Sequence, residues 1–224
     1  MKKSQLLKMA LIRLFLGLLI LVTMFFLPAG TFAYWHAWIY IAIILIPMCV
    51  SFLMLIRKDP DLLERRLRMK EKKSHQKLLI RISWIIFLIA FIIPGFDFRF
   101  GWSHIPIWVV ICAYIFILAG YIFFIFVMKE NSYASRIIEV EKGQKVIDTG
   151  PYAFIRHPLY LSNLIIYLGT PIALGSFWAL IAILPLPVVI IFRLLDEEKT
   201  LQKDLPGYTD YMSEVKYRLI PLIW

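Results

Sequence analysis

The sequence predicts an all-α fold, a polytopic membrane bundle of about six transmembrane helices that ends in a helical hairpin. Three observations predict it. The 224-residue chain is 61% hydrophobic, whereas soluble domains are nearer half apolar. Several apolar runs reach the roughly 20 residues that a helix needs to cross a bilayer. The positive charges also alternate between the two sides of these runs, as they do in membrane proteins.

Four apolar runs are long enough to be full spans, and two shorter runs follow them. The full-length runs are residues 9–27, 34–56, 80–98 and 106–128, and the shorter ones are residues 159–174 and 177–192. Only Gly175 and Ser176 separate the last two runs. A two-residue link leaves room for nothing but a tight turn, so these runs predict a helical hairpin.

The distribution of positive charge predicts the topology. A net charge of +10 would suggest nucleic-acid binding in a soluble protein. Here 24 of the 25 Lys and Arg residues fall on one side of the predicted spans, and only Arg99 falls on the other. This positive-inside pattern places both termini in the cytoplasm. No basic aromatic stripe lies outside the pattern, so we expect no nucleic-acid partner.

The N-terminal run is predicted to be a span rather than a signal peptide. Lys2, Lys3 and Lys8 resemble the charged start of a signal peptide, and residues 31–33 form a weak cleavage site. The apolar stretch, however, exceeds the 7–15 residues of a signal-peptide core. Cys49 and Cys112 lie inside separate predicted spans, and we interpret them as small apolar residues rather than a disulfide or metal pair.

Residues 1–128 are predicted to form a domain of transmembrane helices with little chemistry. The basic loop 57–81 begins a short helix, with Asp59 as its N-cap and Pro60 in its first turn. Its basic side chains either contact anionic lipid headgroups or, the interpretation we favour, belong to a solvated connector that fixes topology. Residues 96–102 are expected to form an outer aromatic loop.

No ionisable side chain lies near the middle of the first four spans. Transporters and proton pumps usually place acids or bases at that depth, so the sequence disfavours a transport function. His36 and His104 fall at the outer interface, and we interpret both as structural.

Residues 129–224 are predicted to carry the chemistry. Gly150 and Pro151 force a turn, and Pro158 suits the first turn of the fifth span. A polar turn therefore precedes a helix N-terminus, whose free N–H groups favour a carboxylate. Arg193 and Glu197 share one helix face at the same end of the hairpin. They form either a weak surface ion pair or part of a binding site.

Two motifs in this region carry a family resemblance. They are Gly150-Pro-Tyr-x3-Arg-His-Pro-x-Tyr160 with Glu197-Glu198, and Leu205-Pro-Gly-Tyr-x2-Tyr211-x3-Val215-x2-Arg218-Leu-Ile-Pro221. Together they resemble the isoprenylcysteine carboxyl methyltransferases, most closely the bacterial branch, and the related phospholipid methyltransferases. The resemblance covers residues 131–224 and implies a methyltransferase that binds S-adenosylmethionine without a Rossmann fold. It also implies a bacterial inner-membrane protein with a cytoplasmic active site.

The resemblance assigns roles residue by residue. It gives ten residues to the cofactor: Gln144, Lys145, Val146, Ile147, Tyr152, His157, Pro158, Leu159, Tyr160 and Glu197. It gives the acceptor's carboxylate to Arg193, as the catalytic and substrate-binding residue, and it implies no metal. The chain departs from the family at Ser162, where many members have glycine, which puts the shape of the cofactor pocket in doubt.

Three functions stay open from the sequence. The first is methylation of a lipophilic acceptor, either a small molecule or a lipid-modified one, dissolved among membrane lipids. The second is a steroid-type membrane reductase that uses NADPH, since that superfamily has a similar turn and hairpin. The third is a non-catalytic scaffold. Tyr208, Tyr211 and Arg218 are expected either to cover the site or to anchor the chain at the interface. The sequence does not identify the acceptor.

Overall fold

The computed structural model describes residues 3–67, 71 and 73–224, and all regular structure in them is helical. The elements, in chain order, are α1 (Lys3–Ala29), α2 (Trp35–Lys58), α3 (Pro60–Leu67), α4 (Ser74–Phe100), α5 (Ile107–Glu130), η1 (Gly150–Ala153), α6 (Pro158–Ala173), α7 (Phe177–Ile183), α8 (Leu186–Asp204) and α9 (Tyr208–Glu214). The predicted all-α fold is confirmed.

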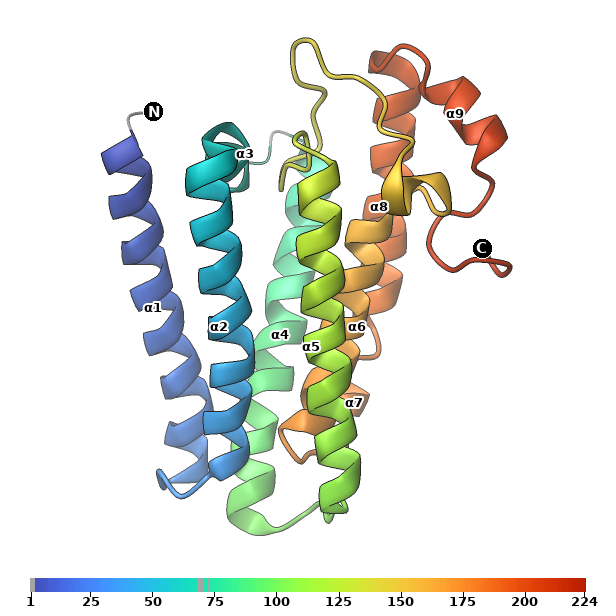
Figure 1. The fold of residues 1–224 in the computed structure, drawn as a ribbon. Helices are drawn as coiled ribbons and strands as arrows, with labels where there is room; N and C mark the ends of the chain where they lie inside the picture. Colours follow the sequence, from blue (N-terminus) through green and yellow to red (C-terminus); the bar gives the residue numbers. More distant parts are fainter. Residues whose placement is uncertain (1–2, 68–70, 72) are drawn as a thin grey trace.

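The long helices form one bundle (Figure 1). α1, α2, α4 and α5 run up and down beside one another, and α6 with α7 and α8 forms the predicted hairpin. α3 and residues 131–157 lie at one end of the bundle. α9 and the N-terminus lie at this same end.

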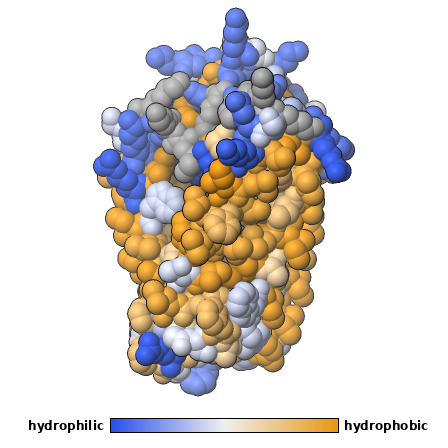
Figure 2. Space-filling model, turned by 90° about the vertical axis from the view of Figure 1, so that its left-hand side faces the viewer, coloured by the Kyte–Doolittle hydropathy of each residue, from blue (hydrophilic) through white to orange (hydrophobic). Residues whose placement is uncertain are grey.

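The bundle has the surface of an integral membrane protein. Among the described residues, five helices are long and apolar enough to cross a membrane. Figure 2 shows a broad apolar belt between two more polar ends. Large apolar side chains are exposed along it, among them Phe15, Trp84 and Ile115. Such a continuous apolar surface would aggregate in water, so it faces lipid.

Two details of the hairpin differ from the prediction. α6 has only 16 residues, which at about 1.5 Å each falls short of the roughly 30 Å hydrocarbon core. It begins below the ends of α5 and α8 (Figure 1). The turn before it, residues 150–157, therefore lies below the end of the bundle and is called the recessed turn. The last span is one apolar segment, Phe177–Asp204, but its regular helical hydrogen bonding is interrupted at Leu184 and Pro185, between α7 and α8. Proline there cannot donate a helical hydrogen bond.

α3 is not the solvated connector that the charge pattern favoured. Its predicted start is confirmed, because the Asp59 carboxylate accepts a hydrogen bond from Leu62 N at 2.9 Å. Leu62 and Leu63 are buried against residues of α1, α2 and α5. The charge pattern does not show the packing of these two leucines, which holds the helix against the bundle.

The expected outer loop at residues 96–102 is also wrong, because Phe96 to Phe100 form the last turn of α4. Asp97, in this turn, is 1% exposed. Its carboxylate accepts hydrogen bonds from Ser103 Oγ at 2.7 Å and from Ser176 Oγ at 2.5 Å. Ser176 caps α7, so a buried acid fastens the hairpin turn to α4.

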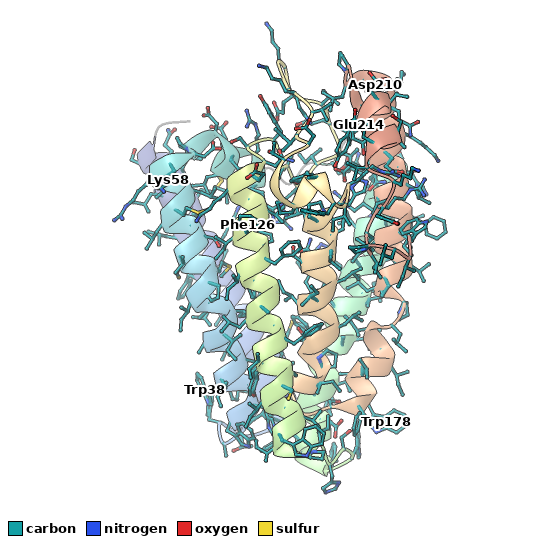
Figure 3. The ribbon with its side chains drawn as sticks, turned by 45° about the vertical axis from the view of Figure 1, so that its right-hand side comes forward. Trp38, Lys58, Phe126, Trp178, Asp210 and Glu214 are labelled. Atoms are coloured by element: carbon teal, nitrogen blue, oxygen red, sulfur yellow. The ribbon has the colours of Figure 1, made fainter. Side chains whose placement is uncertain are left out.

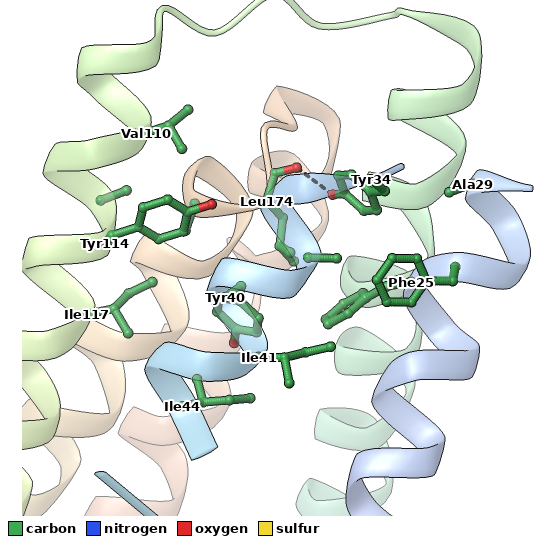
Figure 4. Close-up of a cluster of buried hydrophobic side chains, with 14 of the residues drawn as sticks. Phe25, Ala29, Tyr34, Tyr40, Ile41, Ile44, Val110, Tyr114, Ile117 and Leu174 are labelled. Carbon is green, nitrogen blue, oxygen red and sulfur yellow. Dashed lines mark hydrogen bonds between the residues drawn. The ribbon is translucent and has the colours of Figure 1, made fainter. Parts of the chain in front are cut away.

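A buried cluster holds the hairpin against the N-terminal helices (Figure 4). The Tyr34 hydroxyl donates to Leu174 O at 2.5 Å, and the hydroxyls of Tyr40 and Thr170 lie 2.9 Å apart. Apolar side chains surround these polar contacts. Because both ends of each contact are buried, they fix the far end of α6 and thereby the height of the recessed turn.

Gly95 of α4 lies close against α1, and we expect Gly95→Ala to destabilise the bundle. An added methyl group would lie 2.6 Å from Phe25 O and 2.9 Å from Pro28 Cβ, and neither atom is free to move. Overpacking of this kind costs about 1–3 kcal/mol. The matched control is Gly17→Ala in α1, where nothing lies within 4 Å. Thermal unfolding in detergent should show a lower Tm for Gly95→Ala alone; equal Tm values would contradict this packing.

Candidate functional site

The recessed turn is fixed to the end of α5. Gly150 has φ +57° and faces Glu130, whose Cδ lies 3.0 Å from the position of an added methyl group, so glycine is required here. The Thr149 hydroxyl donates to the Glu130 carboxylate. Asn131 Nδ2 donates to the Tyr152 hydroxyl at 2.9 Å. Two polar side chains at the end of α5 thus set the turn's position.

α9 covers the same turn from the other side. The Tyr211 hydroxyl donates to Tyr152 O at 2.8 Å. Tyr208 and Tyr211 are each 4% exposed and pack with Leu205 and Val215. Burial raises the pKa of Tyr152 and of both α9 tyrosines, so all three are neutral. Their burial inside the protein favours a cover over the interfacial anchor that the sequence left open.

A buried cluster of charged groups centres on Glu198, which is 3% exposed. Its Oε1 accepts from Arg156 Nε at 2.7 Å and lies 3.3 Å from His157 Nε2. Its Oε2 accepts from Arg218 Nε at 2.8 Å. One carboxylate of α8 therefore joins the turn to the C-terminal segment.

Residues 215–218 also accept hydrogen bonds from the backbone N–H groups of the turn. Arg156 N donates to Tyr217 O, and His157 N donates to Arg218 O, both at 2.9 Å. The Arg156 guanidinium donates to Val215 O at 2.8 Å. The protein's own carbonyls therefore occupy the N–H groups of residues 156 and 157, whereas the expectation that the N-terminus of α6 attracts a carboxylate stays a prediction.

Tyr160 and Glu197, which the resemblance assigns to one cofactor, lie in contact with each other. The Tyr160 hydroxyl donates to Glu197 Oε2 at 2.6 Å, and Tyr152 interacts electrostatically with the same carboxylate. Arg193, one turn earlier on α8, interacts electrostatically with Tyr160. The hairpin thus brings residues from the turn, α6 and α8 to one place.

Arg193 is held by groups outside the hairpin. Its Nη1 donates to Gln76 Oε1 at 3.1 Å, and its Nη2 donates to Arg136 O at 2.5 Å. Gln76 has no exposed surface and also donates to Asp196 Oδ2 at 2.8 Å. These two bonds and the hydrogen bond with Tyr160 leave some of the five N–H groups of the guanidinium for a ligand.

A groove of about 420 Å³ lies between the loop before the turn and α9. Among the predicted cofactor residues Gln144, Lys145 and Val146 line it, whereas Ile147 does not. Three carboxylates of Asp148, Asp210 and Glu214 line it as well. Figure 3 shows Asp210 and Glu214 at the end of the molecule that also carries Lys58. The groove is therefore rich in negative charge.

The other predicted residues lie deeper in the protein. His157 and Pro158 are buried, and the histidine already contacts Glu198, so its contact with a cofactor stays a prediction. Leu159 packs beside the cluster of α2, α3 and α5. Ser162 is fully buried, and its hydroxyl donates to Leu159 O at 2.7 Å. Its own helix thus satisfies the hydroxyl that replaces the family's glycine.

One buried polar atom near the site is left for a ligand. Within the described part of the chain, the Tyr208 hydroxyl has no hydrogen-bond partner, although it interacts electrostatically with Glu197 and Glu198. Buried polar groups rarely stay unpaired. The free hydroxyl and the Glu197 carboxylate suit the hydroxyls and amino group of an aminoacyl nucleoside, so these residues fit S-adenosylmethionine.

Comparison with known proteins finds a family match within the C-terminal half of the bundle. Residues 109–203 match the model of the isoprenylcysteine carboxyl methyltransferase (ICMT) family. The match covers less than half of the chain. The match extends from α5 into α8 and so includes the turn, Tyr160 and Glu197. The match supports a membrane methyltransferase.

A reductase is similar to part of the chain. The chain is 31% identical over 94 residues to the Delta(14)-sterol reductase of Mus musculus, a stretch that covers 39% of this chain and 22% of the reductase. The chain thus matches about a fifth of that relative's length.

Sequence reasoning missed the residues that hold the site together. Glu198 stood in the motif without a role, and Asn131, Glu130 and Gln76 were not singled out at all. Glu130 and Asn131 carry a local signal, because both are polar residues at the end of an apolar helix that precedes the turn. Gln76 falls in the basic loop that the sequence predicts, whereas the structure has it in the first turn of α4, and it gives no comparable signal.

Proposed function

We propose that the protein transfers a methyl group from S-adenosylmethionine to a carboxylate on a lipophilic acceptor. The family match supports methyl transfer. The observation that carries the choice of donor is the contact of Tyr160 with Glu197 beside the unpaired Tyr208 hydroxyl. These groups offer acceptors and a donor to the ribose and amino group of the cofactor.

The cofactor supplies a methyl group on a positively charged sulfonium. An acceptor carboxylate with an ordinary pKa near 4 is already ionised at neutral pH, so the residues need not include a general base. Arg193 orients the carboxylate through its remaining N–H donors. Tyr152, Tyr160 and Glu197 hold the donor, because alignment of two reactants lowers the barrier by several kcal/mol.

The recessed position of the turn suits a reaction between a soluble donor and a membrane-dissolved acceptor. Residues 144–148 and α9 border the groove, which we propose as the cofactor's entry from the cytoplasm. The acceptor would reach Arg193 sideways from the bilayer. The positive-inside pattern supports this orientation, and the bacterial inner membrane is the proposed location.

A steroid-type reductase that uses NADPH is the second candidate, and the likeness to the Mus musculus Delta(14)-sterol reductase favours it. The charge of the groove argues against it. Asp148, Asp210 and Glu214 line the groove with Lys145 as the only lysine or arginine among its lining residues, an unfavourable setting for the phosphates of NADPH.

Titration of the purified protein in phosphatidylcholine nanodiscs separates the candidates. We expect saturable binding of S-adenosylhomocysteine and none of NADPH. Incubation of membranes with radiolabelled S-adenosylmethionine should then label a lipid-soluble product that alkali hydrolyses, as an ester does. Binding of NADPH alone would support the reductase, and binding of neither would support a scaffold.

A further inference from the structure

Gln76 is a buried polar residue whose side chain joins α4 to α8. It lies in the first turn of α4 and has no exposed surface. Its Nε2 donates to Asp196 Oδ2 at 2.8 Å, and its Oε1 accepts from Arg193 Nη1 at 3.1 Å. Burial of an amide is unfavourable unless its polar atoms are paired. Here both ends of the amide are paired with charged groups of one helix.

The chemistry of these two partners fixes the orientation of the Gln76 amide. An ionised carboxylate such as Asp196 only accepts hydrogen bonds, and a guanidinium such as Arg193 only donates them. The amide nitrogen must therefore face the acid, and the oxygen must face the arginine. Two exposed side chains also contact the Asp196 carboxylate, His75 Nδ1 at 3.4 Å and Lys199 Nζ at 3.5 Å. A chain of contacts thus runs from the surface through Gln76 to Arg193.

Arg193 is held by neutral groups. Its Nη1 donates to the amide oxygen of Gln76, and its Nη2 donates to Arg136 O at 2.5 Å. It also forms a hydrogen bond with the Tyr160 side chain. Glu197, one turn later on α8, accepts from Tyr160. Among the residues that the structure describes, no carboxylate forms an ion pair with Arg193. The guanidinium therefore keeps its charge without a direct counter-ion.

The arginines of the Glu198 cluster have a different environment. Arg156 and Arg218 both donate to the Glu198 carboxylate, at 2.7 Å and 2.8 Å. Their charges are compensated, as those of buried groups usually are. Arg193 lies little more than one turn earlier on the same helix and is half-buried. A half-buried guanidinium that neutral groups hold in place is positioned for an anion that the protein itself does not supply.

We propose that Gln76 is a positioning residue for acceptor specificity: it fixes Arg193 through a neutral hydrogen bond and so leaves the guanidinium charge to the acceptor's carboxylate. This inference rests on the proposed function, in which Arg193 orients that carboxylate. A glutamate at position 76 would have nearly the same shape, but it would form an ion pair with Arg193 and repel Asp196. Only an amide of this length accepts from the cation and donates to the acid at once.

Binding of N-palmitoylglycine and of its neutral amide to the protein in phosphatidylcholine nanodiscs tests this proposal. The wild type should bind the acid about tenfold or more tightly than the amide, since a hydrogen bond to a charged group is worth that much. Gln76→Glu should lose this preference by weakening binding of the acid alone, because the new carboxylate occupies Arg193. The matched control Gln202→Glu adds the same charge to an exposed position of α8 and should keep the preference.

A double-mutant cycle separates positioning from a structural role. Gln76→Met removes both hydrogen bonds without adding a charge, so it should weaken binding of the acid severalfold and leave binding of the amide unchanged. In an Arg193→Ala background the same substitution should have no effect on the acid, because the two residues act through one contact. An equal loss for acid and amide, or a loss that persists without Arg193, would overturn the proposal.

Titration with S-adenosylhomocysteine in the same samples distinguishes failure of this inference from failure of the proposed function. We expect unchanged affinity for the nucleoside in every variant. If Arg193→Ala loses the preference for the acid and Gln76→Glu keeps it, the proposed function stands and this inference fails. If the wild type binds no nucleoside and does not prefer the acid, both fail. Loss of nucleoside binding in Gln76→Glu and Gln76→Met would assign Gln76 to the fold or to the donor site and overturn the inference.

Discussion

Replacement of Glu198 by glutamine is expected to destabilise the protein by about 3–5 kcal/mol, the cost of removing one partner from a buried ion pair. Its carboxylate is 3% exposed and accepts hydrogen bonds from Arg156 and Arg218. Glutamine keeps the shape but loses the charge, so two guanidinium groups remain without compensation. The recessed turn and residues 215–218 would separate from α8.

Thermal unfolding in detergent measures this effect. The adjacent Glu197 provides the matched control, because it lies on the same helix and contacts Tyr160 rather than an arginine. We expect a large fall in Tm for Glu198→Gln and little change for Glu197→Gln. Similar Tm values for the wild type and Glu198→Gln would show that the buried cluster does not hold the turn in place.

Replacement of Glu197 by glutamine is expected to weaken binding of S-adenosylhomocysteine by about tenfold or more. A hydrogen bond to a charged group is worth about 1.5–3 kcal/mol, and tenfold corresponds to about 1.4 kcal/mol. The Tyr160 hydroxyl can still donate to the glutamine oxygen, so the local structure should persist. The change therefore removes the charge and leaves the geometry.

Equilibrium titration of wild type and variant in nanodiscs measures the dissociation constants. The matched control is Asp204→Asn, which neutralises an exposed carboxylate at the end of the same helix and should bind as the wild type does. An unchanged Kd for Glu197→Gln would remove Glu197 from the proposed cofactor site.

The hairpin and its contact were predictable because they depend on local patterns. The two residues Gly175 and Ser176 leave no length for anything but a turn, and a hairpin returns the chain to its own start. Tyr160 near the start of α6 and Glu197 near the end of α8 must then approach each other. The 2.6 Å contact between them follows from this topology.

The remaining contacts depend on packing between segments that lie far apart in the sequence. The burial of α3 rests on Leu62 and Leu63 meeting α1, α2 and α5, which no local pattern in a basic loop reveals. Gln76 reaches Arg193 across 117 positions. The sequence predicts that Asp97 belongs to an interfacial loop, yet its carboxylate accepts a hydrogen bond from the Ser176 hydroxyl of the hairpin.

A structure of the protein in nanodiscs with bound S-adenosylhomocysteine tests the central claim most directly. The account predicts that the nucleoside lies between the 152–160 turn and α8, with its ribose or amino group against Glu197 and Tyr208. Density for the nucleoside on another part of the protein, with Tyr160 and Glu197 in mutual contact and away from it, would contradict the account.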